Sequence, residues 1–120
     1  MHAQLWREIS EAVAAFFTDL RLHDAADDVI MLLWSEFGRH VRDNGSGTDH
    51  GAGGMAMVLG EAVTGGMYGD YPSLRDGDLT QGNLTYNNDF RSTYSTILER
   101  WFHVEATPIV NGRFEQFAFV

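Results

Sequence analysis

A glycine-rich stretch between two apolar runs is the feature that most constrains the fold of this 120-residue chain. The stretch covers residues 34–54, and the apolar runs on either side cover residues 29–34 and 55–59. Asn44-Gly45-Ser46-Gly47 is a strong turn signal, and so much glycine disfavours a helix. The first run lacks polar alternation, as is typical of a strand covered on both faces. We therefore expect two buried strands joined by a loop that concentrates charge, histidine and glycine.

Helical periodicity occurs on both sides of this region. From residue 3 to residue 23, apolar side chains recur every three or four positions, which predicts an amphipathic helix that faces the core. A second helix is predicted to begin after a cap at Asn88 or Asp89 and to run to about Phe102. A helix followed by a buried strand suggests an αβ unit of a parallel sheet. The sequence thus predicts one α/β domain, residues 1–120, with a short, mainly parallel sheet flanked by helices.

The remaining segments are less regular. Residues 61–88 have no period and contain several glycines, so they are expected to form a long excursion with at most short strands or a hairpin. Beyond Pro108, Asn111-Gly112 predicts a turn, and the phenylalanines of residues 114–119 alternate like a short terminal strand.

Composition excludes several classes of function. A net charge of -9, with only 8 Lys and Arg residues, argues against nucleic acid as a partner. The chain has no cysteine, so any metal must be held by oxygen and imidazole. The longest apolar run falls far short of the ~20 residues that span a bilayer, so no membrane span is expected. The first residues show no export signal.

Candidate site residues lie in the glycine-rich stretch. Glu36, Asp49 and His50 offer two carboxylates and one imidazole, which suit a divalent metal such as zinc or manganese. Such a metal acts as a Lewis acid or lowers the pKa of a bound water. In the alternative interpretation, Glu36 pairs with Arg39 and Asp49 caps the loop through its own backbone. An isolated Asp-His pair has no specificity by itself, so the residues alone favour this structural alternative.

Two arginines are candidates for binding an anionic group. Arg39 follows the first apolar run, and Arg91 lies in the first turn of the second predicted helix. Arg91 stands two residues after Asp89 and therefore has a nearby carboxylate as an alternative partner.

Six blocks of sequence, taken in order, carry a resemblance to a known family. They are Leu-Leu-Trp-Ser-Glu-Phe-Gly-Arg at 32–39, Asn-Gly-Ser-Gly-Thr-Asp-His-Gly at 44–51, Gly-Gly-Met-Tyr-Gly at 65–69, Asp-Gly-Asp-Leu at 76–79, residues 85–98 around Asp89-Phe90-Arg91, and Gly-Arg-Phe at 112–114. Over nearly the whole chain they resemble the carboxyl-terminal part of the bacterial domain-of-unknown-function family 1501. That family is similar to the sulfatase and alkaline-phosphatase superfamily, whose α/β/α sandwiches use two metal ions on phosphate or sulfate esters.

The resemblance implies roles for particular residues. In the superfamily, a strand ends in Ser-Asp-His-Gly and its Asp and His hold one metal. Here the strand end reads Ser35-Glu36-Phe37-Gly38, so Glu36 is a candidate ligand and Phe37 cannot be one. A lone histidine before the next core strand holds the other metal, and His50 matches it. Asp49 is implied as a ligand or as an orienting carboxylate.

The superfamily's nucleophile and its Asp-x-x-x-His pair lie upstream of the matched region. The resemblance therefore implies a fragment or a shortened homologue, part of a metal-dependent hydrolase of phosphate or sulfate esters that is not catalytic alone. Its substrate would be a small-molecule or polymer ester. The alternative is a non-catalytic binding or assembly module, which Phe37 favours. A truncated sheet also suggests homo-oligomerisation, or association with a missing amino-terminal portion. Full-length members of the family resemble exported, periplasmic proteins.

Overall fold

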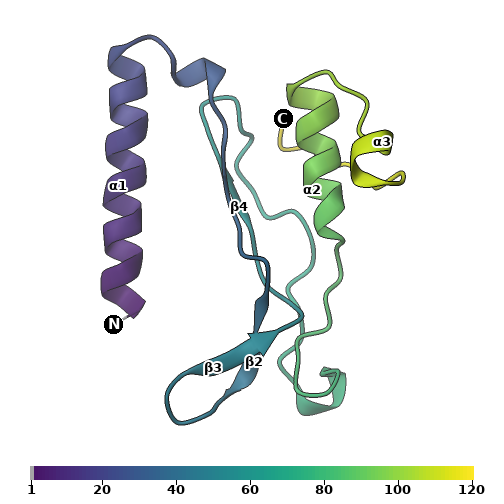
Figure 1. The fold of residues 1–120 in the computed structure, drawn as a ribbon. Helices are drawn as coiled ribbons and strands as arrows, with labels where there is room; N and C mark the ends of the chain where they lie inside the picture. The colour runs from purple at the N-terminus through teal and green to yellow at the C-terminus, as the bar shows by residue number, and fades with distance from the viewer. Residues whose placement is uncertain (1) are drawn as a thin grey trace. The chain divides into compact units, whose positions relative to one another are not determined.

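The computed structural model describes residues 2–120, and Figure 1 shows their helices and strands. The chain divides into two compact units. One unit comprises the chain up to Leu32 together with Val58–Val63, and the other comprises Leu33–Met57 and Thr64–Val120. Within the described residues, none of the helices has the length and apolarity needed to cross a membrane.

The first unit is built on the long helix α1, His2–Leu22, which confirms the helix predicted over residues 3–23. Phe17, on the predicted apolar stripe, is buried, whereas Leu5 and Ile9 on the same stripe are exposed. Near the end of the helix, Arg21 Nε donates a hydrogen bond to Glu61 Oε1 at 2.6 Å. The short 3-10 helix η1, Ala26–Asp28, follows.

The strands form two separate sheets of two strands each. Strand β1, Met31–Leu33, pairs with β4, Met57–Leu59, and β2, Gly38–Asp43, pairs with β3, Thr48–Gly51. Both sheets are antiparallel, so the predicted mainly parallel sheet is wrong. Parallel neighbours need a long crossover, usually a helix, whereas the segment between β1 and β4 contains only a hairpin. The described residues therefore lack the parallel sheet of an α/β/α sandwich.

The glycine-rich stretch, predicted to be a loop, forms the hairpin of β2 and β3 (Figure 1). The Asn44 N–H donates to the Gly47 carbonyl at 2.8 Å across the turn, where Gly45 has a φ of 94° that favours glycine. At the base of the hairpin, a Cβ on Gly38 would collide with the backbone carbonyl of Gly53. Glycine is therefore required for the close approach of these two backbone segments.

The excursion over residues 61–88 is irregular, as predicted. Its one helical turn among the described residues is η2, Asp76–Asp78. Asn83 forms isolated bridges with Thr80 and with His40 of β2, and Arg42 of β2 pairs with Asp76 at 3.1 Å. These contacts anchor the excursion to the hairpin.

A helix begins after Asp89, as predicted. It consists of α2, Phe90–Thr96, which continues as the π-helical turn η3, Ile97–Trp101. The Asp89 side chain caps the helix by accepting the Arg91 N–H at 2.9 Å.

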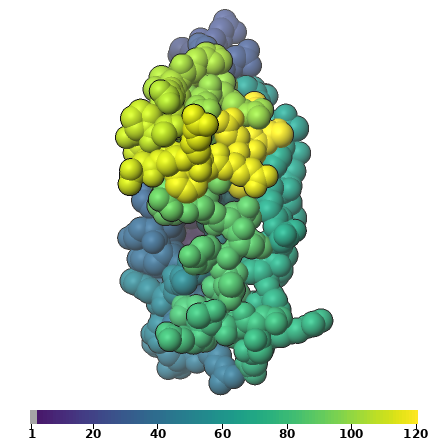
Figure 2. Space-filling view, turned by 90° about the vertical axis from the view of Figure 1, so that its right-hand side faces the viewer, coloured from purple at the N-terminus to yellow at the C-terminus, as the bar shows by residue number. Residues whose placement is uncertain are grey.

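The carboxyl-terminal tail differs from its prediction. A short helix that the sequence did not predict, α3, Thr107–Val110, ends at Asn111, whose φ of 56° is left-handed. Residues 114–119 form no strand, because the Phe117 N–H donates to the side-chain hydroxyl of Thr96 at 2.9 Å instead of to a strand partner. Figure 2 shows these last residues, in yellow, against the yellow-green helical segments. Phe119 is buried there together with Ala106 and Val110, and these side chains form the apolar core of the second unit.

Candidate functional site

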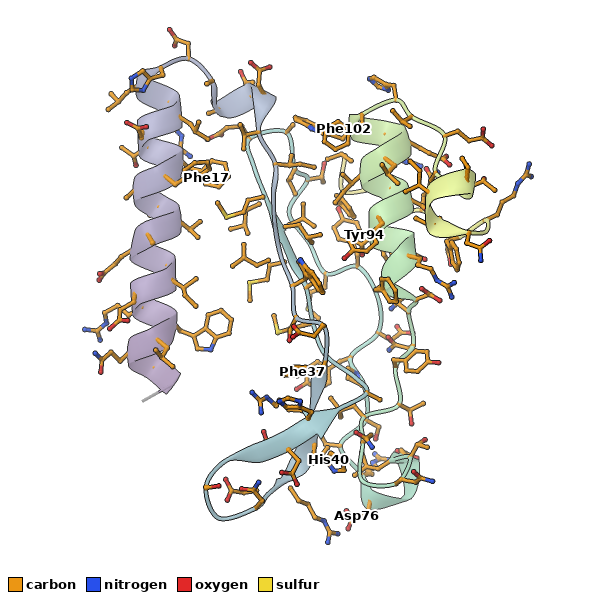
Figure 3. All side chains as sticks on the ribbon, viewed as in Figure 1. Phe17, Phe37, His40, Asp76, Tyr94 and Phe102 are labelled. Carbon is orange, nitrogen blue, oxygen red and sulfur yellow. The ribbon has the colours of Figure 1, made fainter. Side chains whose placement is uncertain are left out.

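The hairpin places His50 against the ring of Phe37. Phe37 directly precedes β2, and its ring stacks on the His50 imidazole with centroids 3.5 Å apart and planes 13° apart. The strand register sets His50 opposite Arg39, whose guanidinium lies 5.3 Å from the Phe37 ring centroid. Figure 3 labels Phe37 beside the hairpin. We call the pair of rings the Phe37–His50 stack.

The other predicted residues of the hairpin have different surroundings. Asp49 is exposed, and its Oδ1 accepts a hydrogen bond from Asn44 Nδ2 at 2.7 Å. Glu36 is also exposed and forms no ion pair with any of residues 3–120. Arg39 donates to the backbone carbonyl of Thr48 at 2.8 Å instead of pairing with Glu36. Asp49, a predicted metal ligand, and Arg39, a candidate for binding an anionic group, thus also hold the hairpin together.

The described part of the chain contains no group of three or more His, Asp or Glu side chains that could hold a metal ion. Glu36, Asp49 and His50 therefore do not form such a group with one another, and each stays a predicted ligand. The imidazole of His50 is exposed and has no hydrogen-bond partner within residues 3–120. A free ring nitrogen of this kind is chemically suited to zinc.

Arg91 is held by the acid two residues before it. Its Nε donates to Asp89 Oδ1 at 2.9 Å, and a terminal guanidinium nitrogen donates to Oδ2 at 2.6 Å. The hydrogen bonds from the Arg91 side chain and backbone lower the pKa of Asp89 from 3.8 to about 2. The Arg91 guanidinium also lies 4.2 Å from the Phe114 ring centroid. Two guanidinium nitrogens of Arg91 therefore already donate hydrogen bonds to Asp89, so fewer N–H donors of Arg91 are available to bind an anion.

A polar pocket of about 310 Å³ lies in the second unit and was not among the predicted sites. It is lined by Ser95 of α2, Glu99 of η3, Thr107 of α3 and residues of the tail up to Gln116. The only sequence signal for it is the spacing of Ser95 and Glu99, four residues apart on one helical face.

A family model described as Protein of unknown function (DUF1501) matches residues 1–109. The chain belongs to the DUF1501 family. This confirms the family resemblance carried by the blocks of sequence, and the DUF1501 match includes the hairpin with Phe37 and His50 and the helix from α2 through η3. No curated protein and no solved structure matches the chain.

Proposed function

We propose that this DUF1501 chain supplies part of the metal site of a hydrolase that acts on phosphate or sulfate esters, and that it is not catalytic alone. The observation that carries the proposal is the Phe37–His50 stack. Phe37 covers one face of the imidazole, and the His50 residue is exposed. A ligand whose orientation is fixed in advance loses less conformational freedom when a metal binds.

Each candidate residue has a role that follows from its position. His50 would donate a ring nitrogen, and Glu36, exposed at the bend before β2, would donate a carboxylate oxygen. Asp49, oriented by Asn44, would act as a ligand or as the carboxylate that orients one. The metal, zinc or manganese, would act as a Lewis acid on the ester oxygens or activate a water.

Arg39 suits the negative charge of such a substrate. Its guanidinium lies over Phe37, so a cation stands beside the stacked imidazole. Because the described residues contain no group of three or more His, Asp or Glu side chains that could hold a metal, further ligands and the rest of the catalytic machinery would come from outside these residues. We therefore propose that the chain contributes to catalysis and is not catalytic alone.

A non-catalytic binding or assembly module is the second candidate function. The observation that favours it is Phe37, which stands where the superfamily has a metal-binding histidine and whose ring has no atom that can hold a metal. In this alternative the stack is only a structural contact of the hairpin. The two functions differ in whether His50 binds a metal.

Calorimetric titration with zinc and with manganese tests the proposal. The wild-type protein is compared with His50→Ala and with a control, His23→Ala, which removes another exposed imidazole at the end of α1. We expect saturable binding that is lost in His50→Ala and kept in His23→Ala. Equal binding by wild type and His50→Ala would leave the binding or assembly module as the better account.

Phe37→Ala provides a second variant. Removing the ring releases the imidazole from its stack, so we expect weaker metal binding with the ligand still present. Hydrolysis of p-nitrophenyl phosphate and p-nitrophenyl sulfate, measured with and without each metal, then tests the reaction. Hydrolysis that is independent of metal and of His50 would contradict the proposed chemistry.

A further inference from the structure

The polar pocket of the second unit contains a hydroxyl that the protein leaves without a partner. Ser95 is only 2% exposed, and its Oγ is the buried side-chain atom without a hydrogen bond within residues 2–120. Burying an unpaired hydroxyl costs stability, so most buried hydroxyls are bonded. The neighbouring Thr96 shows the usual arrangement, since its Oγ1 donates to the Ser92 carbonyl and accepts the Phe117 N–H. Ser95 therefore carries a buried hydroxyl without a hydrogen bond, and it is one of the residues that line the pocket.

Glu99 supplies a half-buried carboxylate to the same wall. Its Oε1 accepts the backbone N–H of Ala106 at 3.2 Å, and its Oε2 accepts from the side-chain amide of Gln116. These two donors fix the carboxylate, and each oxygen keeps a lone pair for a ligand. Glu99 lies in the π-helical turn, and such turns are frequent at functional sites.

The rest of the lining combines donors and acceptors. Glu105 is a second carboxylate, Thr107 a second hydroxyl, and Arg113 a guanidinium donor, while Phe114 adds an apolar ring. Two carboxylates against one guanidinium disfavour an anion such as a phosphate or sulfate ester. An ammonium group only donates hydrogen bonds, so it would not use the donors of the Arg113 guanidinium.

We infer that this pocket binds a small neutral polyol, such as a monosaccharide. Every hydroxyl of such a ligand both donates and accepts, which matches a lining of carboxylates, hydroxyls, an amide and a guanidinium. The C–H faces of the ligand match the Phe114 ring, and the volume of about 310 Å³ is at the lower end of the range for small-molecule sites. Ser95 Oγ has almost no accessible surface in the free protein, so we expect its side chain to rotate toward the pocket when a ligand hydroxyl binds beside it.

Nuclear magnetic resonance titration of the ¹⁵N-labelled protein tests this inference. The probes are D-glucose, D-galactose, D-mannose, N-acetyl-D-glucosamine and myo-inositol, with putrescine and inorganic phosphate as charged comparisons. We expect at least one neutral probe to give saturable shifts at the amides of Ala106, Gly112 and Gln116, which border the pocket. We also expect it to bind more tightly than either charged probe.

Two variants and one control locate the binding. Ser95→Ala should weaken affinity about five-fold, which corresponds to loss of one hydrogen bond to the ligand, and should leave the melting temperature unchanged or raised. Glu105→Gln, which changes an exposed pocket residue, should also weaken binding. Ser92→Ala removes another buried serine of α2 that does not line the pocket, so its affinity should equal that of wild type.

Three results would overturn the inference. They are the absence of saturable shifts with all five neutral probes, tighter binding of putrescine or phosphate, and unchanged affinity in both Ser95→Ala and Glu105→Gln. None of these measurements involves metal or His50. The polyol inference can therefore be refuted while the proposed hydrolase function stands, and the hydrolase function can be refuted while the polyol inference stands.

Discussion

The hydroxyl of Thr96 joins the carboxyl-terminal tail to α2, and its removal should loosen that junction. Thr96 is fully buried, and its Oγ1 donates to the Ser92 carbonyl at 2.7 Å and accepts the Phe117 N–H at 2.9 Å. Thr96→Val keeps the shape of the side chain but leaves the Phe117 N–H without an acceptor. An unsatisfied buried donor costs about 1–3 kcal/mol, and because Phe117 is only half-buried we expect about 1–2 kcal/mol.

Amide hydrogen exchange at Phe117 is the most direct assay. A loss of 1–2 kcal/mol corresponds to exchange that is roughly 5-fold to 30-fold faster, and the urea midpoint should fall with an unchanged slope. Ser95→Ala is the matched control, because it alters the adjacent helical residue but removes a hydroxyl that has no partner. Its effect on stability should stay within about 0.5 kcal/mol, helped by the helix propensity of alanine. Equal exchange at Phe117 in the two variants would refute the role of the Thr96 hydroxyl.

Two further predictions concern Asp89 and the base of the hairpin. The folded-state pKa of Asp89 is lowered from 3.8 to about 2 by Arg91, so its stabilisation is fully present above the unfolded-state pKa and is lost as the pH falls towards 2. Asp89→Asn should therefore lower stability by about 1 kcal/mol at pH 7, after allowance for solvent screening, and by much less at pH 2; urea unfolding at both pH values checks this. Gly38→Ala should cost about 3 kcal/mol or more in thermal unfolding because the new Cβ meets the Gly53 carbonyl, whereas Gly77→Ala, with open space around it, should cost little.

The helices could be predicted because their signals are local. The apolar residues along α1 recur every three or four positions, and the capping carboxylate of Asp89 accepts a backbone N–H from two residues later. The sequence singled out His50 as a candidate ligand and Phe37 as a residue that cannot be one. The stack between them depends on the register of β2 and β3, which pairs residues far apart along the chain, and the sequence does not fix that register.

Strand pairing and the polar pocket were decided only by the tertiary structure. An apolar run such as residues 29–34 predicts a buried strand but does not indicate which other strand it pairs with or in which direction. The antiparallel pairing of β1 with β4 therefore could not be predicted from it. The pocket likewise requires the tail to return to the helix formed by α2 and η3, where Gln116 of the tail bonds Glu99 of η3. The sequence by itself determined α1, the start of α2, the position of the turn and the family. The tertiary structure decided which distant segments meet, because such contacts depend on the packing of the whole unit.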